Sequence, residues 1–238
     1  LNTMKIDVIA VLPHLFSSFF ETRIVKRARE SGILNLRVFD LHDWGIGNYR
    51  QIDDKPYGGN GGMVIMPEPL ANAIESLSSK RKYDEIIYMT CDGQKLNHEL
   101  LIQLLNKDLL IICGHYKGID YRIRQLYVTK EISIGDYVLS GGELAAAVLV
   151  DALIRLLPGV VNSYESITSD SFYMGLLEPP VYTVPRVFKG IAVPEVLLSG
   201  NHKAIEKWRL EQSIKRTKEL RPDPYKKFIE KNPDSQTQ

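Results

Sequence analysis

Apolar and β-branched residues recur in five short segments along the chain, and this pattern is typical of strands. The segments lie at 5–12, 36–38, 85–90, 109–113 and 131–134. The run at 109–113 is apolar at every position, which indicates a strand buried on both faces. Helical periodicity separates these segments, at 13–30, 66–79 and in a stretch that Asn97 could cap. Because strands and helices alternate, the pattern predicts an α/β fold with a mainly parallel sheet.

The pattern changes after the fifth strand. An alanine- and leucine-rich helix begins at Glu143 and stops at Pro158. Residues 160–175 are polar and aperiodic, which predicts a linker. A basic helix then begins after Gly200 and continues to about Leu220. The predicted organisation is a first domain at 1–159, the linker at 160–175 and a small helical C-terminal domain at 176–238.

The composition is that of a globular protein, with 44% hydrophobic and 25% charged residues. No apolar run reaches the roughly 18 residues that cross a bilayer, so we expect no membrane partner and a cytoplasmic location. Cys91 and Cys113 are far apart and lie in apolar contexts, where we expect both to be buried filler. No spacing of Cys or His predicts a metal site.

The net charge of +1 conceals an uneven distribution. Residues 201–231 contain ten Lys and Arg against five Asp and Glu, a local charge of +5. A basic segment on a mildly acidic body suits binding to a polyanion. A solvated helix face explains the charge equally well.

Glycine-bearing loops follow three of the predicted strands, at 91–93, at 114–118 and at 135–142. The carboxyl ends of parallel strands meet at one edge of a sheet, so these loops predict a ligand crevice there. Neither a dinucleotide fingerprint nor a phosphate-binding loop is present. A further cluster of glycines at 58–62 suits either a mobile loop or a close backbone approach.

Two charged residues have both a structural and a catalytic interpretation. Arg155, near the end of its helix, could complement the helix dipole or face a phosphate or keto oxygen. Asp170, in the linker, could cap a turn or act as a general base. Spacing alone favours the structural interpretation of each.

Five segments in colinear order closely resemble the bacterial tRNA (guanine-N1-)-methyltransferase (TrmD) family of the SPOUT superfamily. They read DDKPYGG at 53–59, CGHYKGID at 113–120, SIGDYVLSGGE at 133–143, SDSF at 169–172 and LLSGNH at 197–202. The resemblance implies a deep trefoil knot, a homodimer with active sites shared between chains, and S-adenosylmethionine as methyl donor. It implies methylation of tRNA at N1 of the guanine immediately 3′ of the anticodon, position 37. It also implies Mg²⁺, for which the sequence offers no ligand cluster.

The resemblance assigns roles by matched position. Asp170 matches the general base and Arg155 its electrostatic partner, and the basic C-terminal segment, including Lys215 and Arg216, gains a role in binding tRNA phosphates. Glu178 occupies a position that faces the methionine end of the cofactor. The other expected cofactor contacts are Tyr88, Met89, Thr90, Gly93, Gly114, Ile134, Gly135, Asp136, Tyr137, Val138, Leu139, Gly141 and Gly142.

Two positions depart from the expected motif, because His115 replaces an Arg and Lys117 replaces a Glu. The residues between Tyr88 and Gly93 also differ from the expected ones. Two alternatives therefore stay open. One is an RNA-binding protein that has lost activity, and the other is a SPOUT enzyme that methylates a ribose hydroxyl. The intact segment around Asp170 favours the base methylase over both.

Overall fold

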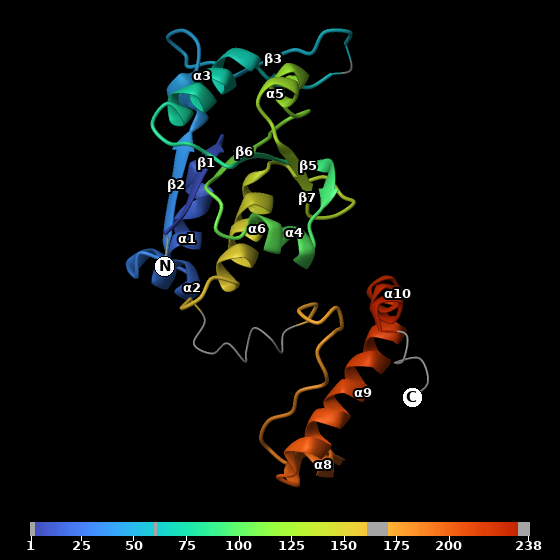
Figure 1. Cartoon of the computed structure of the whole chain (residues 1–238). Helices are drawn as coiled ribbons and strands as arrows, with labels where there is room; N and C mark the ends of the chain where they lie inside the picture. Colours follow the sequence, from blue (N-terminus) through green and yellow to red (C-terminus); the bar gives the residue numbers. More distant parts are fainter. Residues whose placement is uncertain (1–2, 60, 161–170, 233–238) are drawn as a thin grey trace. The chain divides into compact units, whose positions relative to one another are not determined.

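The computed structural model describes residues 3–59, 61–160 and 171–232. The chain divides into two compact units, Leu1–Asn162 and Ser163–Gln238. The positions of the two units relative to one another are not determined, so each is described by itself (Figure 1). No helix among the described residues is both long and apolar enough to cross a membrane.

The first unit is built on a parallel five-stranded sheet with the order β2-β1-β6-β5-β7. This arrangement confirms the predicted α/β class with a mainly parallel sheet. The strands are β1 (Met4–Ala10), β2 (Leu34–Asp40), β5 (Glu85–Lys95), β6 (Leu109–Cys113) and β7 (Lys130–Ser133). A separate two-stranded ribbon pairs β3 (Asp53–Asp54) with β4 (Val64–Ile65).

Helices cover both faces of the sheet (Figure 1). The helices α2 (Arg23–Glu30), α4 (His98–Leu104) and α6 (Glu143–Arg155) share one apolar core, and α3 (Pro67–Ser78) and α5 (Tyr121–Leu126) share the other. The central strand β6 is buried throughout, and its side chains alternate between the two cores. The uninterrupted apolar run at 109–113 reflects this double burial.

The helix predicted over 13–30 is three shorter helices, η1 (Pro13–Phe16), α1 (Ser17–Phe20) and α2. The single-helix prediction was wrong at Thr22, whose backbone is extended. The amide of Thr22 donates to the Phe19 carbonyl, and its hydroxyl donates to the same oxygen at 2.8 Å. A Thr side chain that bonds the local backbone offers an alternative to the helical pattern.

Other helix boundaries follow the predicted signals. Asn97 caps α4, since its side-chain oxygen accepts from the Leu100 amide at 2.8 Å. A 3-10 turn, η2 (Leu41–Trp44), follows β2, and α6 begins at Glu143 as predicted.

The second unit contains α8 (Glu195–Leu198), α9 (His202–Leu220) and α10 (Pro222–Lys231), with a small hairpin of β8 (Val187–Phe188) and β9 (Ile191–Ala192). Asn201 caps α9, and the helix ends before Pro222 as the prolines predict. Pro222 then opens α10, because proline suits the first helical turn. The buried Thr217 joins the segment at Leu177 to α9 by accepting from the Leu177 amide at 2.9 Å.

Candidate ligand pocket

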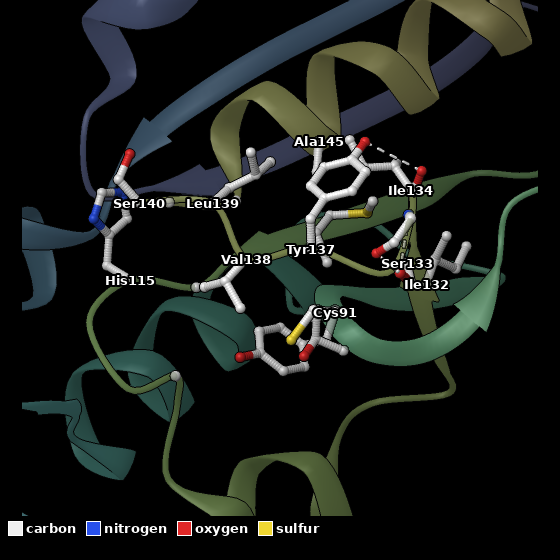
Figure 2. Close-up of a pocket in the computed structure, with 18 of the residues that line it drawn as sticks. Cys91, His115, Ile132, Ser133, Ile134, Tyr137, Val138, Leu139, Ser140 and Ala145 are labelled. Carbon is white, nitrogen blue, oxygen red and sulfur yellow. Dashed lines mark hydrogen bonds between the residues drawn. The ribbon is translucent and has the colours of Figure 1, made fainter.

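A cavity of about 350 Å³ lies at the carboxyl ends of β6 and β7 and beside the middle of β5. The sheet order places β5 between the other two strands, so the loops that follow β6 and β7 lie on either side of β5. The start of α6 closes the cavity through Gly142 and Ala145. Figure 2 shows Tyr137, Val138 and Leu139 on one side of this space and Cys91 below them. A parallel α/β sheet commonly holds its ligand at such an edge.

The first wall comes from β5 through Tyr88, Met89, Thr90 and Cys91. The sequence predicted a loop at 91–93, but β5 continues to Lys95. Met89 and Gln94 both pair with Ile132, so the intervening residues form a large bulge rather than a loop after the strand. Cys91 is exposed in this bulge, and its prediction as buried filler was wrong, whereas Cys113 is buried.

The second wall follows β6 and consists of residues 114–118. Gly114 permits the closest packing here, because a Cβ on it would lie 2.8 Å from the Tyr88 hydroxyl oxygen. The loop turns back where the Gly118 amide donates to the His115 carbonyl at 2.8 Å. The backbone of Tyr116 is left-handed at φ 60°, which marks a constrained turn.

The third wall follows β7 and runs from Ser133 to Gly142, without Asp136. The Ser133 hydroxyl and the Gly135 backbone hydrogen-bond to each other at 3.0 and 3.1 Å. The Tyr137 hydroxyl donates to the Ile134 carbonyl at 3.3 Å, the dashed contact in Figure 2. These hydrogen bonds within residues 133–137 stabilise the conformation of the loop.

The buried carboxylate of Glu143 joins the second and third walls. Its Oε2 lies 2.7 Å from Nε2 of His115, and its Oε1 accepts from the amides of Val11 and Leu12 at 3.0 Å each. The amide of Gly142 also donates to the Gly114 carbonyl at 2.8 Å. The loops after β6 and β7 are therefore held together by both side chain and backbone.

The cavity is apolar and aromatic, with basic but no acidic side chains among the described residues that line it. Its basic residues are His115 and Lys117. Burial raises the pKa of Tyr88 and of Tyr116, so both phenols stay protonated at neutral pH. No group of three His, Cys, Asp or Glu in the described part of the chain has the geometry to hold a metal ion.

Most of the cofactor contacts expected from the sequence lie together in this cavity. Asp136 and Gly93 do not line it. Asp136 forms an exposed ion pair with Lys95 at 2.5 Å, and Gly93 packs on β7, where a Cβ would lie 2.5 Å from the Glu131 carbonyl carbon. The expected residues that do line the cavity are Tyr88, Met89, Thr90, Gly114, Ile134, Gly135, Tyr137, Val138, Leu139, Gly141 and Gly142.

The remaining expected residues lie elsewhere. Arg155 is the last residue of α6, at the end of the helix opposite the cavity. Glu178 belongs to the second unit, and Asp170 lies outside the described residues. Lys215 is exposed on α9, whereas Arg216 is half-buried and its Nε makes no hydrogen bond within the described residues.

Sequence reasoning missed the structural role of Glu143 and the contribution of Cys91 to the cavity. The partners of Glu143 just after β1 are more than 130 residues away in sequence. The only local signal was an acidic residue at a helix start, which ordinarily indicates dipole complementation alone.

The fold and the cavity define an α/β protein with an apolar cavity at the carboxyl edge of a parallel sheet. Residues 4–227 match the model of the family described as tRNA (Guanine-1)-methyltransferase TrmD. The chain therefore belongs to this family.

Curated relatives agree over nearly the whole chain. The chain is 54% identical over 226 residues to a tRNA (guanine-N(1)-)-methyltransferase from Cytophaga hutchinsonii, covering 94% of this chain and 96% of that one. It is 52% identical over 221 residues to a protein of the same name from Christiangramia forsetii, and 50% identical over 221 residues to one from Bacteroides thetaiotaomicron. In both cases 92% of this chain and 98% of the relative are covered.

The contact between Gly142 and β6 predicts the effect of one added methyl group. In Gly142→Ala the new Cβ would lie 2.8 Å from both the Cys113 Cα and the Gly114 nitrogen, which are backbone atoms that cannot move aside cheaply. We expect the loops to separate and S-adenosylmethionine affinity, measured by calorimetry, to fall by about tenfold or more, since an overpacked site shifts its backbone.

Gly32→Ala serves as the control, because a Cβ at Gly32 would have no atom within 4 Å. Its φ of 72° should cost about 1 kcal/mol of stability. Donor affinity should stay unchanged. Normal affinity in a folded Gly142→Ala protein would contradict the close packing of these loops.

Proposed function

We propose that this protein transfers a methyl group from S-adenosylmethionine to N1 of the guanine at position 37 of tRNA, immediately 3′ of the anticodon. The observation that carries the proposal is the family match over residues 4–227, together with a cavity lined by most of the expected donor contacts. The relatives at 50–54% identity are named as guanine-N1 methyltransferases of tRNA. We extend that activity to this chain.

The cavity suits the proposed donor in size and in chemistry. Small-molecule sites usually measure ~300–1,000 Å³ and are mostly apolar with a few polar groups. The walls here offer aromatic rings, Ile134, Val138 and Leu139, with backbone groups of three loops between them. When bound, S-adenosylmethionine supplies an electrophilic methyl group on its sulfonium. We further propose that the bulge of β5 and the loops after β6 and β7 form the trefoil knot that the resemblance implies.

The chemistry requires a base and an electrostatic partner near the guanine. N1 of guanine carries a proton and becomes a good nucleophile only as that proton leaves. In the proposed mechanism the Asp170 carboxylate accepts this proton. Arg155 stabilises the negative charge that develops on the adjacent keto oxygen. Glu178 is proposed to face the methionine end of the donor.

The position of Arg155 supports a site built from two chains. α6 begins at the cavity with Glu143 and ends at Arg155. With a rise of ~1.5 Å per residue, the Cα atoms of these two residues are about 18 Å apart. The guanidinium of one chain is therefore too far from its own cavity to assist chemistry there, and we propose that it serves the cavity of a partner chain.

Exposed apolar residues on α6 support the same proposal. Leu144 and Val148 lie one helical turn apart on α6 and are exposed, as are Val138 and Leu139 on the adjoining loop. Leu144 and Val148 form an exposed apolar stripe on α6, and exposed apolar surface of this kind is typical of an interface. We propose a homodimer joined across this surface, as the family resemblance implies.

The proposed base predicts a large loss of rate in Asp170→Asn. The amide keeps the size and some hydrogen bonding but cannot accept the proton, so single-turnover methyl transfer should fall by roughly 10²–10⁴-fold. Calorimetry should show donor binding intact. The measurement is mass spectrometry of tRNA after incubation with isotope-labelled donor, which also locates the methyl group.

The same assay on the unmodified protein distinguishes base methylation from ribose methylation and from RNA binding without transfer. Label on N1 of guanine 37 supports the proposal. Label on a ribose hydroxyl would replace it with a ribose methylase, and binding of tRNA without any transfer would leave an inactive RNA-binding protein. A normal rate in Asp170→Asn would remove Asp170 from the role of base.

The shared site predicts rescue between two inactive chains. One chain would carry Asp170→Ala and the other Gly135→Val, whose side chain would clash with Tyr137, since a Cβ on Gly135 lies 2.3 Å from the Tyr137 ring. A mixed dimer should contain one site with an intact base and an intact cavity. Activity should return on mixing, and an inactive mixture with verified heterodimers would confine the site to one chain.

The basic helix α9 is proposed to bind tRNA through phosphates. Lys215 is exposed on α9, and Lys203 and Lys207 are exposed nearer its start. A substitution of Arg216 would test this role less directly than the sequence suggested, because the Arg216 side chain is half-buried. The second unit then supplies tRNA affinity that falls with salt.

Lys215→Ala should weaken tRNA binding and reduce the slope of log affinity against log salt by about one unit, as expected for one lost phosphate contact. Filter binding at several salt concentrations measures the slope. Lys80→Ala, an exposed lysine of the first unit, is the control and should not change it. An unaltered slope in Lys215→Ala would make this lysine part of a solvated surface only.

A further inference from the structure

The bulge of β5 contains Thr90, Cys91 and Asp92, where the sequence departs from the expected family residues. Thr90 and Cys91 line the cavity, and Asp92 does not. A strand that loops out between two residues paired with the same partner needs something to fix its shape, because the ladder hydrogen bonds are interrupted there.

Arg124 of α5 supplies this support. Its Nη2 donates to Oδ2 of Asp92 at 2.9 Å. The same guanidinium forms a fork on Glu131 of β7, with Nε to Oε1 at 2.7 Å and Nη2 to Oε2 at 2.6 Å. A bidentate pair of this kind fixes direction as well as distance.

The guanidinium is held by its surroundings. The Arg124 side chain is only 17% exposed. Its Cζ lies 5.4 Å from the ring centroid of Tyr88 and 5.5 Å from that of Tyr121. Cation–π contacts operate at such distances. Tyr88 is itself part of the cavity wall, so Arg124 contacts one wall residue directly.

Asp92 connects Arg124 to the cavity wall, because it bonds both Arg124 and Thr90. Its Oδ1 accepts a hydrogen bond from the Thr90 hydroxyl. The hydrogen bond from Thr90, followed by Arg124, lowers the pKa of Asp92, so the carboxylate is charged at neutral pH. Thr90 is therefore oriented by a charged group that Arg124 fixes in place. Arg124 on α5 therefore acts on the β5 wall of the cavity through its hydrogen bond to Asp92.

We propose that Arg124 is a positioning residue for the methyl donor, which it serves by holding the β5 bulge in the shape that forms one wall of the cavity. This role rests on the proposed function, because it takes S-adenosylmethionine as the occupant. Arg124 does not line the cavity, so it acts through Asp92, Thr90 and Tyr88.

The test is Arg124→Met, which keeps length and apolar contact but removes the fork. The Kd for S-adenosylmethionine by calorimetry should rise about tenfold, the loss expected for a charged hydrogen bond. The KM for the donor should rise in parallel. The kcat at saturating donor and the KM for tRNA should stay unchanged, because the wall affects binding of the donor and not the base.

Arg122→Met is the matched control on the same helix. Arg122 is 64% exposed and pairs with Asp120, two residues earlier in the sequence. Donor affinity in this variant should equal that of the unmodified protein. A similar rise in Kd in both variants would show that α5 responds to any lost arginine, and would overturn the specific role of Arg124.

Asp92→Asn keeps the proposal testable if Arg124→Met folds poorly. The Asp92 side chain is 58% exposed, so this exchange leaves the core intact. It should reproduce the rise in Kd, and the double variant should lose little more than either single one, because both remove the same path. Additive losses, or unchanged affinity in a folded Asp92→Asn, would overturn it.

The proposed function and the proposed role of Arg124 are overturned by different results. If the unmodified protein binds no S-adenosylmethionine, the proposed function fails and the role of Arg124 fails with it. If the unmodified protein binds the donor and Arg124→Met binds it equally well, only the role of Arg124 is overturned.

Discussion

Glu143 is 1% exposed, yet its carboxylate is the point at which three separate parts of the first unit meet. It accepts hydrogen bonds from the amides that follow β1, lies against His115 from the loop after β6, and opens α6. Burying a carboxylate is costly unless donors compensate for the lost water. Here two amides, an imidazole and the positive end of a helix dipole do so. The cavity loops depend on this residue for their mutual position.

The paired glycines before Glu143 follow from the same constraint. A Cβ on Gly141 would lie 2.2 Å from Nε2 of His115, and one on Gly142 would meet the backbone after β6. The glycines are thus required for packing of one loop on another, in addition to any approach of backbone to ligand. His115 in place of the expected Arg still places a ring nitrogen 2.7 Å from Glu143, so this departure leaves a contact at that position.

Local signals explain which features were predictable from the sequence. The burial of β6, the cap of α4 by Asn97 and the start of α6 each have a sequence signal within a few residues, and all three were predicted correctly. The gathering of the loops after β6 and β7 into one cavity also followed, because parallel strands end at a common edge. The extension of β5 into a bulge did not, since the Arg124 that fixes Asp92 is 32 residues away. The break at Thr22 was missed because the periodicity of apolar residues carries no information about a side chain that bonds the nearby backbone, as Thr22 bonds the Phe19 carbonyl.

In the proposed mechanism, one part of the chain binds the donor and other parts supply the catalytic groups. The described walls of the cavity carry aromatic, apolar and basic groups but no carboxylate that could accept a proton. The proposed base and the proposed guanidinium come from the segment after α6 and from the far end of α6 itself. On the proposed two-chain site, a single chain would hold the donor without the proposed base and guanidinium beside it. On the proposed two-chain site, methyl transfer becomes possible only when a partner and a tRNA bring the remaining groups to the cavity, which keeps a reactive sulfonium away from a base until the substrate is present.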